Sequence, residues 1–457
     1  MSELFERDGG SIRDPTGQVF HSGDRIFRTL SEQGAKFVTQ IYADKFANLV
    51  SSGLLIRGEL ISIPAQLASP DVAAVIEHPK LPIVCYPYEM TFSALKAAAL
   101  HHLRFHRTLL AANFDLSDAT AYNIQFLGTT PVFIDPTSII AWRPNPWRGY
   151  RQFCRQFLYP LMMTAHGNCN FHSFYRGQID GIDEAILLAM LPLHQSLKPS
   201  VILHARLPRW LKNHAQKGAR PRVPLTSKAI FDEILAGLER LVRRLAPGSS
   251  VPRVWRKYMD SPPYHLRQME LKRSFVAHWM GAWKPRRLLD LGCNTGEFSS
   301  LALAAGAEYC IGVESDGASA DTAFLRSDKE RQKFLPLVID LLDPSPARGW
   351  GGSERKSFLD RAKPDCVIAL ALVHHVAVTG IRLEEIVSGI LAMAPRGLLE
   401  FVPESDPMVQ RMLNDRGIVF QGYSEEVFVS QLKRLARIVG ECEISPGGRK
   451  LWAFERL

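Results

Sequence analysis

Residues 286–307, RRLLDLGCNTGEFSSLALAAGA, have the pattern of a buried strand, a glycine-bearing turn and a helix. Such an element receives a nucleotide or an anion at the helix N-terminus, where backbone N–H groups are free to donate. The dinucleotide fingerprint G-x-G-x-x-G is not met, because Asn294 follows Gly292 and Glu297 stands where the third glycine belongs. A carboxylate there would repel a pyrophosphate, so a dinucleotide is not the expected ligand.

The turn instead follows the pattern acidic-x-G-x-(G/N)-x-G, from Asp290 to Gly296. This pattern closely resembles that of class I S-adenosylmethionine-dependent methyltransferases. Their cofactor has a cationic sulfonium and an amino-acid tail, so nearby carboxylates favour its binding. Asn294 replaces the middle glycine, and asparagine is the non-glycine residue that best tolerates a left-handed backbone.

Acidic residues also end the next two candidate strands. Glu314 closes the second strand, where a carboxylate can accept hydrogen bonds from the ribose hydroxyls. By the same resemblance, Asp340 at the end of the third strand lies beside the adenine amino group. The expected residues for S-adenosyl-L-methionine are Asp290, Gly292, Asn294, Gly296, Glu314 and Asp340. The alternative is that they are caps and turn residues of an unrelated α/β domain.

The end of the fourth strand should face the transferred methyl group, because ligands of open α/β sheets bind beyond the carboxyl ends of the strands. This end reads LALVHH, residues 370–375, and lacks the N/D-P-P-Y signature of amino-methylating nucleic-acid enzymes. The sequence Ser261-Pro262-Pro263-Tyr264 occurs before the first strand and is interpreted as a turn. We therefore expect a small-molecule or glycan hydroxyl, amine or carboxylate as acceptor.

His374 and His375 are the candidate catalytic residues, since imidazole titrates near neutral pH. Methyl transfer is an in-line displacement that proximity and alignment can largely accomplish, and a base is needed only for a weakly acidic acceptor. Alternatively, one histidine hydrogen-bonds the cofactor or caps the next helix. Glu400 and Glu404, after the fifth strand, are either further acceptor contacts or surface carboxylates.

An alternation of short β-rich runs and helical segments follows Lys272 and must position these residues. It predicts an α/β fold: a Rossmann-like, seven-stranded sheet, parallel with an antiparallel edge strand from a closing hairpin. The expected strands are Arg287–Leu291, Tyr309–Glu314, Phe334–Asp340, Asp365–Leu372 and Gly397–Val402. The expected helices are Glu297–Ala305, Ala318–Lys333, Leu383–Met393 and Ser424–Val439, and the hairpin turns at Ser445–Gly448.

The N-terminal half contains Asp118, Asn123 and Asp135 in the order of the catalytic base and metal ligands of protein kinases. The segments Gly17–Leu30 and Phe92–Asn113 predict a hairpin and a long helix. Pro136 replaces the glycine that follows the second aspartate in kinases, and no glycine-rich phosphate loop or paired strand lysine is evident. This half resembles a kinase C-lobe used for binding or as a scaffold, and whether it binds a nucleotide stays open. The alternative is a turn with Asx caps.

The length of 457 residues and 46% hydrophobic content predict a multidomain protein. We expect an α+β domain over residues 1–210, a basic linker and connecting helix over 211–271, and a methyltransferase domain over 272–457. No stretch approaches the roughly 20 apolar residues of a membrane span. The N-terminus has no secretory h-region, so we expect a cytoplasmic protein. The oligomeric state cannot be predicted.

The net charge and the cysteines indicate which kinds of partner and cross-link to expect. A net charge of +9 permits a nucleic-acid partner, without favouring one at this length. The seven cysteines are scattered without a C-x-x-C pair, so reduced thiols are expected rather than disulfides or metal ligands.

Five segments together resemble the family of the rhizobial host-specific nodulation protein NoeA. They are Ser117–Asp135, Trp147–Phe157, the DLGCNTGEFS turn, the LVHH strand end and Gly397–Gln410. The resemblance implies a role in nodulation, by modification of a lipo-chitooligosaccharide signal or another surface glycan. The alternatives are a nucleic-acid (RNA) methyltransferase that uses Arg206–Lys228 to contact a phosphate backbone, and a non-catalytic interaction protein with the cofactor fold.

Overall fold

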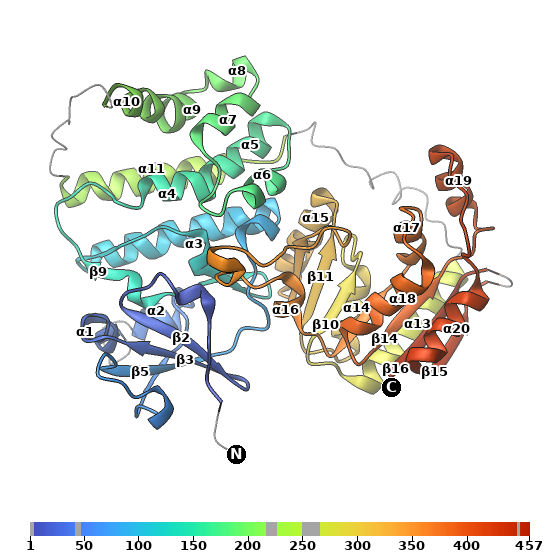
Figure 1. Ribbon diagram of the computed structural model, residues 1–457. Helices are drawn as coiled ribbons and strands as arrows, with labels where there is room; N and C mark the ends of the chain where they lie inside the picture. The colour runs from blue at the N-terminus through green and yellow to red at the C-terminus, as the bar shows by residue number, and fades with distance from the viewer. Residues whose placement is uncertain (1–3, 42–46, 216–225, 249–265, 446–447) are drawn as a thin grey trace. The chain divides into compact units, whose positions relative to one another are not determined.

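The chain forms two compact units in a computed structural model (Figure 1). The structure describes residues 4–41, 47–215, 226–248, 266–445 and 448–457. Unit 1 comprises Met1–Pro252 and Pro346–Lys356, and unit 2 comprises Arg253–Ser345 and Ser357–Leu457.

Unit 2 is built on a seven-stranded sheet with the order β12-β11-β10-β13-β14-β16-β15. The five strands from β12 to β14 run parallel, whereas β16 is antiparallel to both β14 and β15. This is the predicted parallel sheet closed by an antiparallel hairpin, in the class I methyltransferase order. The strands are β10 Leu288–Leu291, β11 Cys310–Glu314, β12 Phe334–Val338, β13 Cys366–Ala369, β14 Arg396–Phe401, β15 Ala436–Glu443 and β16 Lys450–Arg456.

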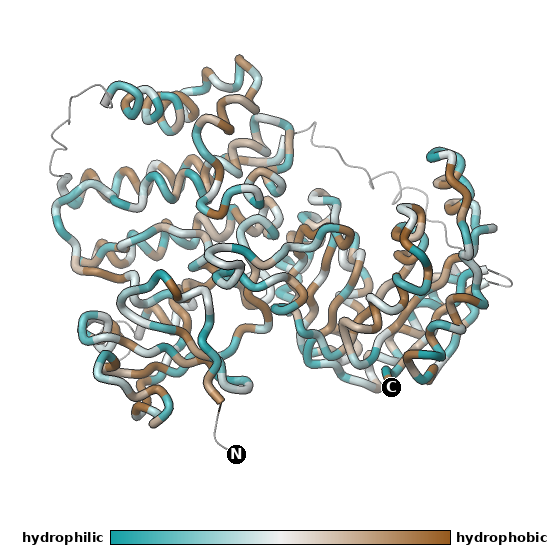
Figure 2. The backbone as a smooth tube through the Cα atoms, in the orientation of Figure 1, coloured by the Kyte–Doolittle hydropathy of each residue, from teal (hydrophilic) through white to brown (hydrophobic). Residues whose placement is uncertain are grey.

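The central strands of this sheet are buried on both faces, as parallel strands flanked by helices must be. Every residue of β10, β11 and β13 is buried, and Figure 2 shows this part of unit 2 as mainly apolar. The core includes Val276 and Met280 of the helix that precedes the sheet. The helices are α13 Leu266–Trp283, α14 Glu297–Ala305, α15 Gly317–Glu330, α16 Phe358–Ala362, α17 Val373–Ala377, α18 Leu383–Met393, α19 Pro407–Arg416 and α20 Glu425–Leu435.

Four element boundaries in unit 2 differ from the predicted ones by two or more residues. Strand β12 ends at Val338 rather than Asp340, and helix α15 ends at Glu330 rather than Lys333. The strand expected over Asp365–Leu372 ends at Ala369, and a left-handed Ala371 precedes α17. The helix expected to reach Val439 ends at Leu435, because the following residues pair with β16. Cross-strand hydrogen bonds and packing thus override helical periodicity there. Part of the predicted hairpin turn, residues 446–447, lies outside the described residues, as does the Ser261–Tyr264 segment.

Unit 1 begins with a five-stranded antiparallel sheet of order β1-β2-β3-β5-β4. Its hairpin of β2 and β3 and its long helix α3 confirm two sequence predictions. The strands are β1 Glu6–Arg7, β2 Gly17–Ser22, β3 Arg25–Leu30, β4 Glu59–Ile61 and β5 Ala74–Pro79. Two small antiparallel pairs follow α3: β6 Phe114–Leu116 with β9 Ile139–Ala141, and β7 Ile124–Leu127 with β8 Thr130–Phe133.

Helices make up the rest of the described part of unit 1, and the last of them is the predicted connecting helix. Helix α11 buries Phe231, Leu235 and Val242, and its Asp232 receives a 2.8 Å hydrogen bond from Arg107 of α3. Residues 211–252 therefore cluster with unit 1, so the boundary differs from the predicted one. The helices are α1 Glu32–Gln40, α2 Ala47–Ser51, α3 Phe92–Ala111, α4 Tyr150–Phe153, α5 Tyr159–Gly167, α6 His172–Gly177, α7 Glu184–Met190, α8 Leu193–Ser196, α9 Pro199–Val201, α10 Leu207–Ala215 and α11 Lys228–Arg244.

Residues 346–356, here called the strap, belong to unit 1 although they interrupt the sequence of unit 2. Glu354 of the strap is buried and accepts hydrogen bonds from Arg13 at 2.9 and 3.1 Å. The Arg355 guanidinium lies 4.3 Å from the Tyr122 ring centroid. A Cβ atom on Gly9 would lie 1.9 Å from the Ser353 carbonyl oxygen, so only glycine permits this approach.

All seven cysteines are free thiols. In the described part of the chain, no helix combines the length and apolar character that a membrane crossing requires.

A buried ion pair joins α13 to the sheet of unit 2. Lys272 Nζ lies 2.6 Å from Glu400 Oε2, and the two side chains are 3% and 0% exposed. Arg449 Nη1 lies 3.8 Å from the other carboxylate oxygen. Burying these charges costs desolvation energy. Removal of one partner therefore lowers the stability of the fold far more than replacement of both partners by apolar residues.

We expect Lys272→Met to lower the free energy of unfolding by about 3 kcal/mol, the low end for an unpaired buried charge, because Arg449 remains nearby. The double variant Lys272→Met/Glu400→Leu should recover most of this loss. Urea unfolding of both variants followed by circular dichroism measures the difference. A single variant as stable as the wild type would contradict the assignment.

Candidate cofactor site

The turn between β10 and α14 has the backbone that its sequence predicts. Gly292, Asn294 and Gly296 have φ of 72°, 49° and 76°, in the left-handed region. The N–H groups of Gly292 and Cys293 both donate to the Val313 carbonyl, at 2.8 and 3.0 Å. A Cβ on Gly296 would lie 2.3 Å from the Phe334 ring, so packing as well as conformation requires glycine there.

Glu314 at the end of β11 ties this turn to the neighbouring strand. Its Oε2 accepts a 3.0 Å hydrogen bond from the Asn294 N–H, and its Oε1 accepts one of 2.9 Å from the Asp316 N–H. Burial raises the pKa of Glu314, although these backbone donors oppose the shift. The carboxylate is thus held at the carboxyl edge of the sheet with lone pairs still open to further donors.

Asp290 at the end of β10 is buried beneath the turn. Its Oδ2 accepts a 2.6 Å hydrogen bond from the Ser299 hydroxyl of α14. Burial raises the pKa of Asp290 to about 7, and the nearby Glu314 raises it further while Ser299 and Lys272 lower it. This carboxyl group therefore changes charge near neutral pH.

The turn also contains an unused acceptor. Asn294 Oδ1 is buried and has no hydrogen-bond partner among the described residues. An unpaired buried carbonyl oxygen is costly, which indicates that a ligand donor satisfies it. A Cβ on Gly292 would lie 3.3 Å from Leu372, so a side chain there would narrow the space beside the turn. Acceptors and carboxyl groups beside a glycine turn suit the cationic S-adenosylmethionine.

Asp340 lies at the same edge of the sheet, two residues beyond the end of β12. The preceding Ile339 N–H donates to the Glu314 carbonyl at 3.0 Å, which links the two strand ends. Asp340 is exposed, and its Oδ1 accepts from the Leu342 N–H at 2.9 Å. The structure therefore brings Asp340 to the edge of the sheet that holds Glu314.

His374 and His375 lie in α17, just after the end of β13, with ring centroids 4.2 Å apart. Burial lowers the pKa of His374 well below its ordinary value and that of His375 to about 4. Both rings are therefore neutral near pH 7. The Nδ1 atom of His374 is buried without a hydrogen-bond partner among the described residues, so this ring still has an unused donor or acceptor.

Two residues that shape unit 2, Gly312 and Lys272, were missed by the sequence analysis. Gly312 of β11 leaves room for the Cys293 thiol, because a Cβ there would lie 2.6 Å from its Sγ. Glu400 was considered an acceptor contact or a surface carboxylate, but it is fully buried against Lys272. A lone glycine or lysine in the sequence gives no signal of either role.

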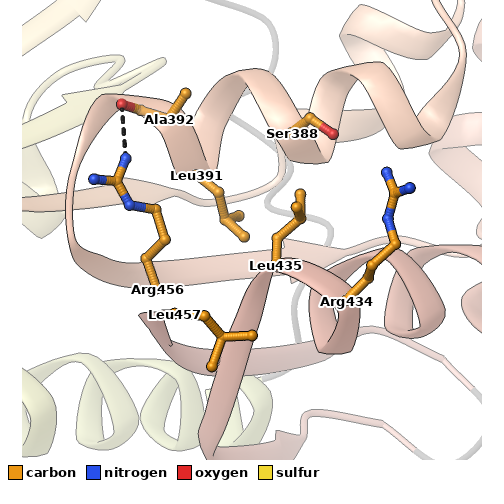
Figure 3. A pocket seen from close by; sticks show the side chains of 7 residues that line it. All are labelled: Ser388, Leu391, Ala392, Arg434, Leu435, Arg456 and Leu457. Carbon is orange, nitrogen blue, oxygen red and sulfur yellow. Dashed lines mark hydrogen bonds between the residues drawn. The ribbon is translucent and has the colours of Figure 1, made fainter.

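A pocket of about 360 Å³ lies elsewhere in unit 2 (Figure 3). Its lining residues come from α18, the end of α20 and the end of the chain, including Leu391, Leu435 and Arg456. These residues flank the amino end of β14, whereas the glycine turn and Glu314 lie at carboxyl ends of strands. The pocket is therefore separate from the candidate cofactor site.

In unit 1 the structure brings Asp118, Asn123 and Asp135 together. The Asn123 Nδ2 atom lies 3.3 Å from an oxygen of each aspartate. Burial and the nearby Asp135 and Asp14 carboxylates raise the pKa of Asp118 to about 7. The basic stretch Arg206–Lys228 is described only in part, since residues 216–225 lie outside the described residues.

Comparisons with known proteins relate the chain to one nodulation protein. No protein-family model matches the chain. Nodulation protein NoeA of Rhizobium meliloti (strain 1021) is 39% identical over 464 residues, covering 98% of this chain and 96% of that protein.

Two solved structures are also similar. N-methyltransferase NodS from Bradyrhizobium japonicum WM9, in complex with S-adenosyl-L-homocysteine, has 17% identity and a TM-score of 0.32 over 44% of this chain and 91% of its own. Magnesium protoporphyrin IX methyltransferase from Synechocystis PCC 6803, with the same product bound, has 18% identity and a TM-score of 0.32 over 49% and 94%. On the identity and coverage shared with NoeA, the chain belongs to the NoeA family of nodulation proteins.

Proposed function

We propose that unit 2 transfers a methyl group from S-adenosylmethionine to a small-molecule or glycan acceptor. The observation that carries this proposal is the glycine turn. Its Asn294 Oδ1 has no hydrogen-bond partner among the described residues, and its Asn294 N–H donates to the Glu314 carboxylate at the end of the next strand. Asp290, Gly292 and Gly296 complete the turn, and Asp340 stands at the adjacent strand end. These residues offer acceptors and negative charge to a ligand that is rich in donors and carries a sulfonium.

The reaction requires alignment more than proton transfer. The acceptor atom attacks the sulfonium methyl carbon as the carbon–sulfur bond breaks, so the leaving product is a neutral thioether. His374 and His375 are the candidate catalytic residues at the acceptor side. Because burial keeps both rings neutral, they orient an acceptor hydroxyl or amine by hydrogen bonding and act at most as weak bases.

The proposed biological role follows from the NoeA relative. Its name states a part in nodulation, and the shared identity extends over almost the whole of both chains. We extend this role to the present chain, with a lipo-chitooligosaccharide signal or another surface glycan as the acceptor class. A glycan supplies hydroxyl and amine groups, which can form hydrogen bonds with the neutral histidine rings.

The first test is binding of S-adenosylmethionine and S-adenosylhomocysteine to the full chain, measured by isothermal titration. Glu314→Ala should weaken binding about 10- to 100-fold, because hydrogen bonds to a charged group contribute about 1.5–3 kcal/mol. The matched control is Glu308→Ala, an exposed glutamate before the same strand, which should bind like the wild type. A folded wild type that binds neither compound would refute the proposal.

The pH dependence of binding tests the role of Asp290. Its pKa of about 7 means that the group is largely protonated at pH 6, while a cationic ligand favours the carboxylate. The affinity for S-adenosylmethionine should therefore rise as pH increases from 6 to 8, by up to about tenfold per pH unit below the pKa. S-adenosylhomocysteine lacks the sulfonium charge and should show a smaller rise. Asp290→Asn should abolish the difference between the two profiles; identical profiles in the wild type would count against this role.

A further inference from the structure

One cluster of polar side chains in unit 1 has no part in methyl transfer. Arg28 of β3 lies at its centre, with Nη1 2.8 Å from Asp135 Oδ1 and 3.2 Å from Asp14 Oδ2. Thr137 Oγ1 lies 2.8 Å from the same nitrogen. Asp135 also accepts from Asn123, so the cluster connects the antiparallel sheet to the loops around β7 and β8.

These residues occupy distinct places in the fold. Arg28 comes from the third strand of the sheet, Asn123 from the connection before β7, and Asp135 from the residues just after β8. Protein kinases place a cation on the third strand for the phosphates, and an asparagine and an aspartate of the second lobe for magnesium. The sequence offered no paired strand lysine, and the structure puts Arg28 in that place.

The charges of the cluster are not balanced. Two carboxyl groups, those of Asp14 and Asp135, contact the one guanidinium of Arg28, and a third, that of Asp118, joins the cluster through Asn123. Arg28, Asp14 and Asp135 are 9%, 21% and 18% exposed, so water compensates little of the excess negative charge. The Nε atom of Arg28 is buried and has no hydrogen-bond partner among the described residues. A divalent cation would balance the carboxylates, and a phosphate oxygen would satisfy the Arg28 donor.

We propose that this cluster binds a nucleoside triphosphate together with a divalent cation. Asn123 and Asp135 contact the cation, and Arg28 contacts the phosphates. Asp118 positions the Asn123 amide through their hydrogen bond. This site is independent of the methyltransferase proposal, since all its residues belong to unit 1.

The cation is expected to bind only with the nucleotide. Among the described residues, no group of three or more His, Cys, Asp or Glu side chains is arranged to hold a metal ion. Magnesium typically uses one or two carboxylates and completes its coordination with substrate phosphates and water. The protein therefore supplies part of the coordination and the triphosphate supplies the rest.

Arg28 suits both the free and the bound state. Without a ligand, it neutralises Asp135 through the 2.8 Å contact. When the cation takes that carboxylate, the guanidinium becomes available to the phosphates, which it can engage with two parallel hydrogen bonds. An exchange of partners thus replaces one set of charge pairs with another, without leaving a buried charge unpaired.

The test is isothermal titration of the full chain with adenylyl-imidodiphosphate in three arms: with Mg²⁺, with EDTA, and Mg²⁺ alone. We expect micromolar binding with Mg²⁺, at least about tenfold weaker binding in EDTA, and no binding of Mg²⁺ alone. Asp135→Asn should weaken binding at least about tenfold, because the carboxylate charge on the cation is lost.

The matched control is Asp24→Asn, an aspartate that is 67% exposed in the β2–β3 turn, which should bind like the wild type. Arg28→Lys keeps the charge and the fold but loses paired hydrogen bonds, so it should bind with intermediate affinity. Circular dichroism verifies that each variant is folded. The proposal fails if the wild type does not bind at millimolar nucleotide, or if folded Asp135→Asn binds as the wild type does. Either failure leaves cofactor binding by unit 2 unaffected.

Discussion

The hydrogen bond from the Asn294 N–H to the Glu314 carboxylate organises the candidate cofactor site. It joins the turn after β10 to the end of β11, and the Glu314 carbonyl in turn receives the Ile339 N–H beyond β12. Three consecutive strand ends are therefore fixed relative to one another through a single residue. Because the carboxyl ends of parallel strands lie at one edge, this connection brings separate acidic residues together on one candidate binding surface.

Buried carboxyl groups recur in unit 2, and each is compensated in a different way. Asp290 accepts from a hydroxyl, Glu314 from backbone N–H groups and Glu400 from the Lys272 ammonium. The hydroxyl and backbone N–H donors only partly offset the effect of burial on the pKa, so the pKa of Asp290 and that of Glu314 are raised. The two carboxyl groups beside the turn are thus the ones that a cationic ligand would stabilise, whereas the Lys272–Glu400 pair serves the fold.

The sequence predicted unit 2 well because its signals are local. Short apolar runs, glycines that require positive φ and acidic strand ends identify the sheet and the turn without knowledge of tertiary contacts. The errors fall where tertiary contacts decide. Residues after Leu435 continue a helical pattern yet pair with β16, and Gly440 in β15 lies against Trp279, where a Cβ would approach its ring within 2.4 Å. A helix-compatible run becomes a strand when a partner strand takes its hydrogen bonds.

Unit 1 was less predictable because its organising contacts join segments far apart in the chain. The strap contacts the N-terminal segment through the ion pair between Glu354 and Arg13. The sequence of the strap is glycine-rich with mixed charge, and it does not predict this partner. Arg28 is a similar case: an arginine in an exposed-looking hairpin has no local signature, and its place is defined by the contact with Asp135. The spacing of Asp118, Asn123 and Asp135 was readable, because all three lie within one short stretch of chain. The basic residue of the cluster, Arg28, could not be predicted in the same way. It comes from a different part of the fold, and it is an arginine where the kinase pattern has a lysine.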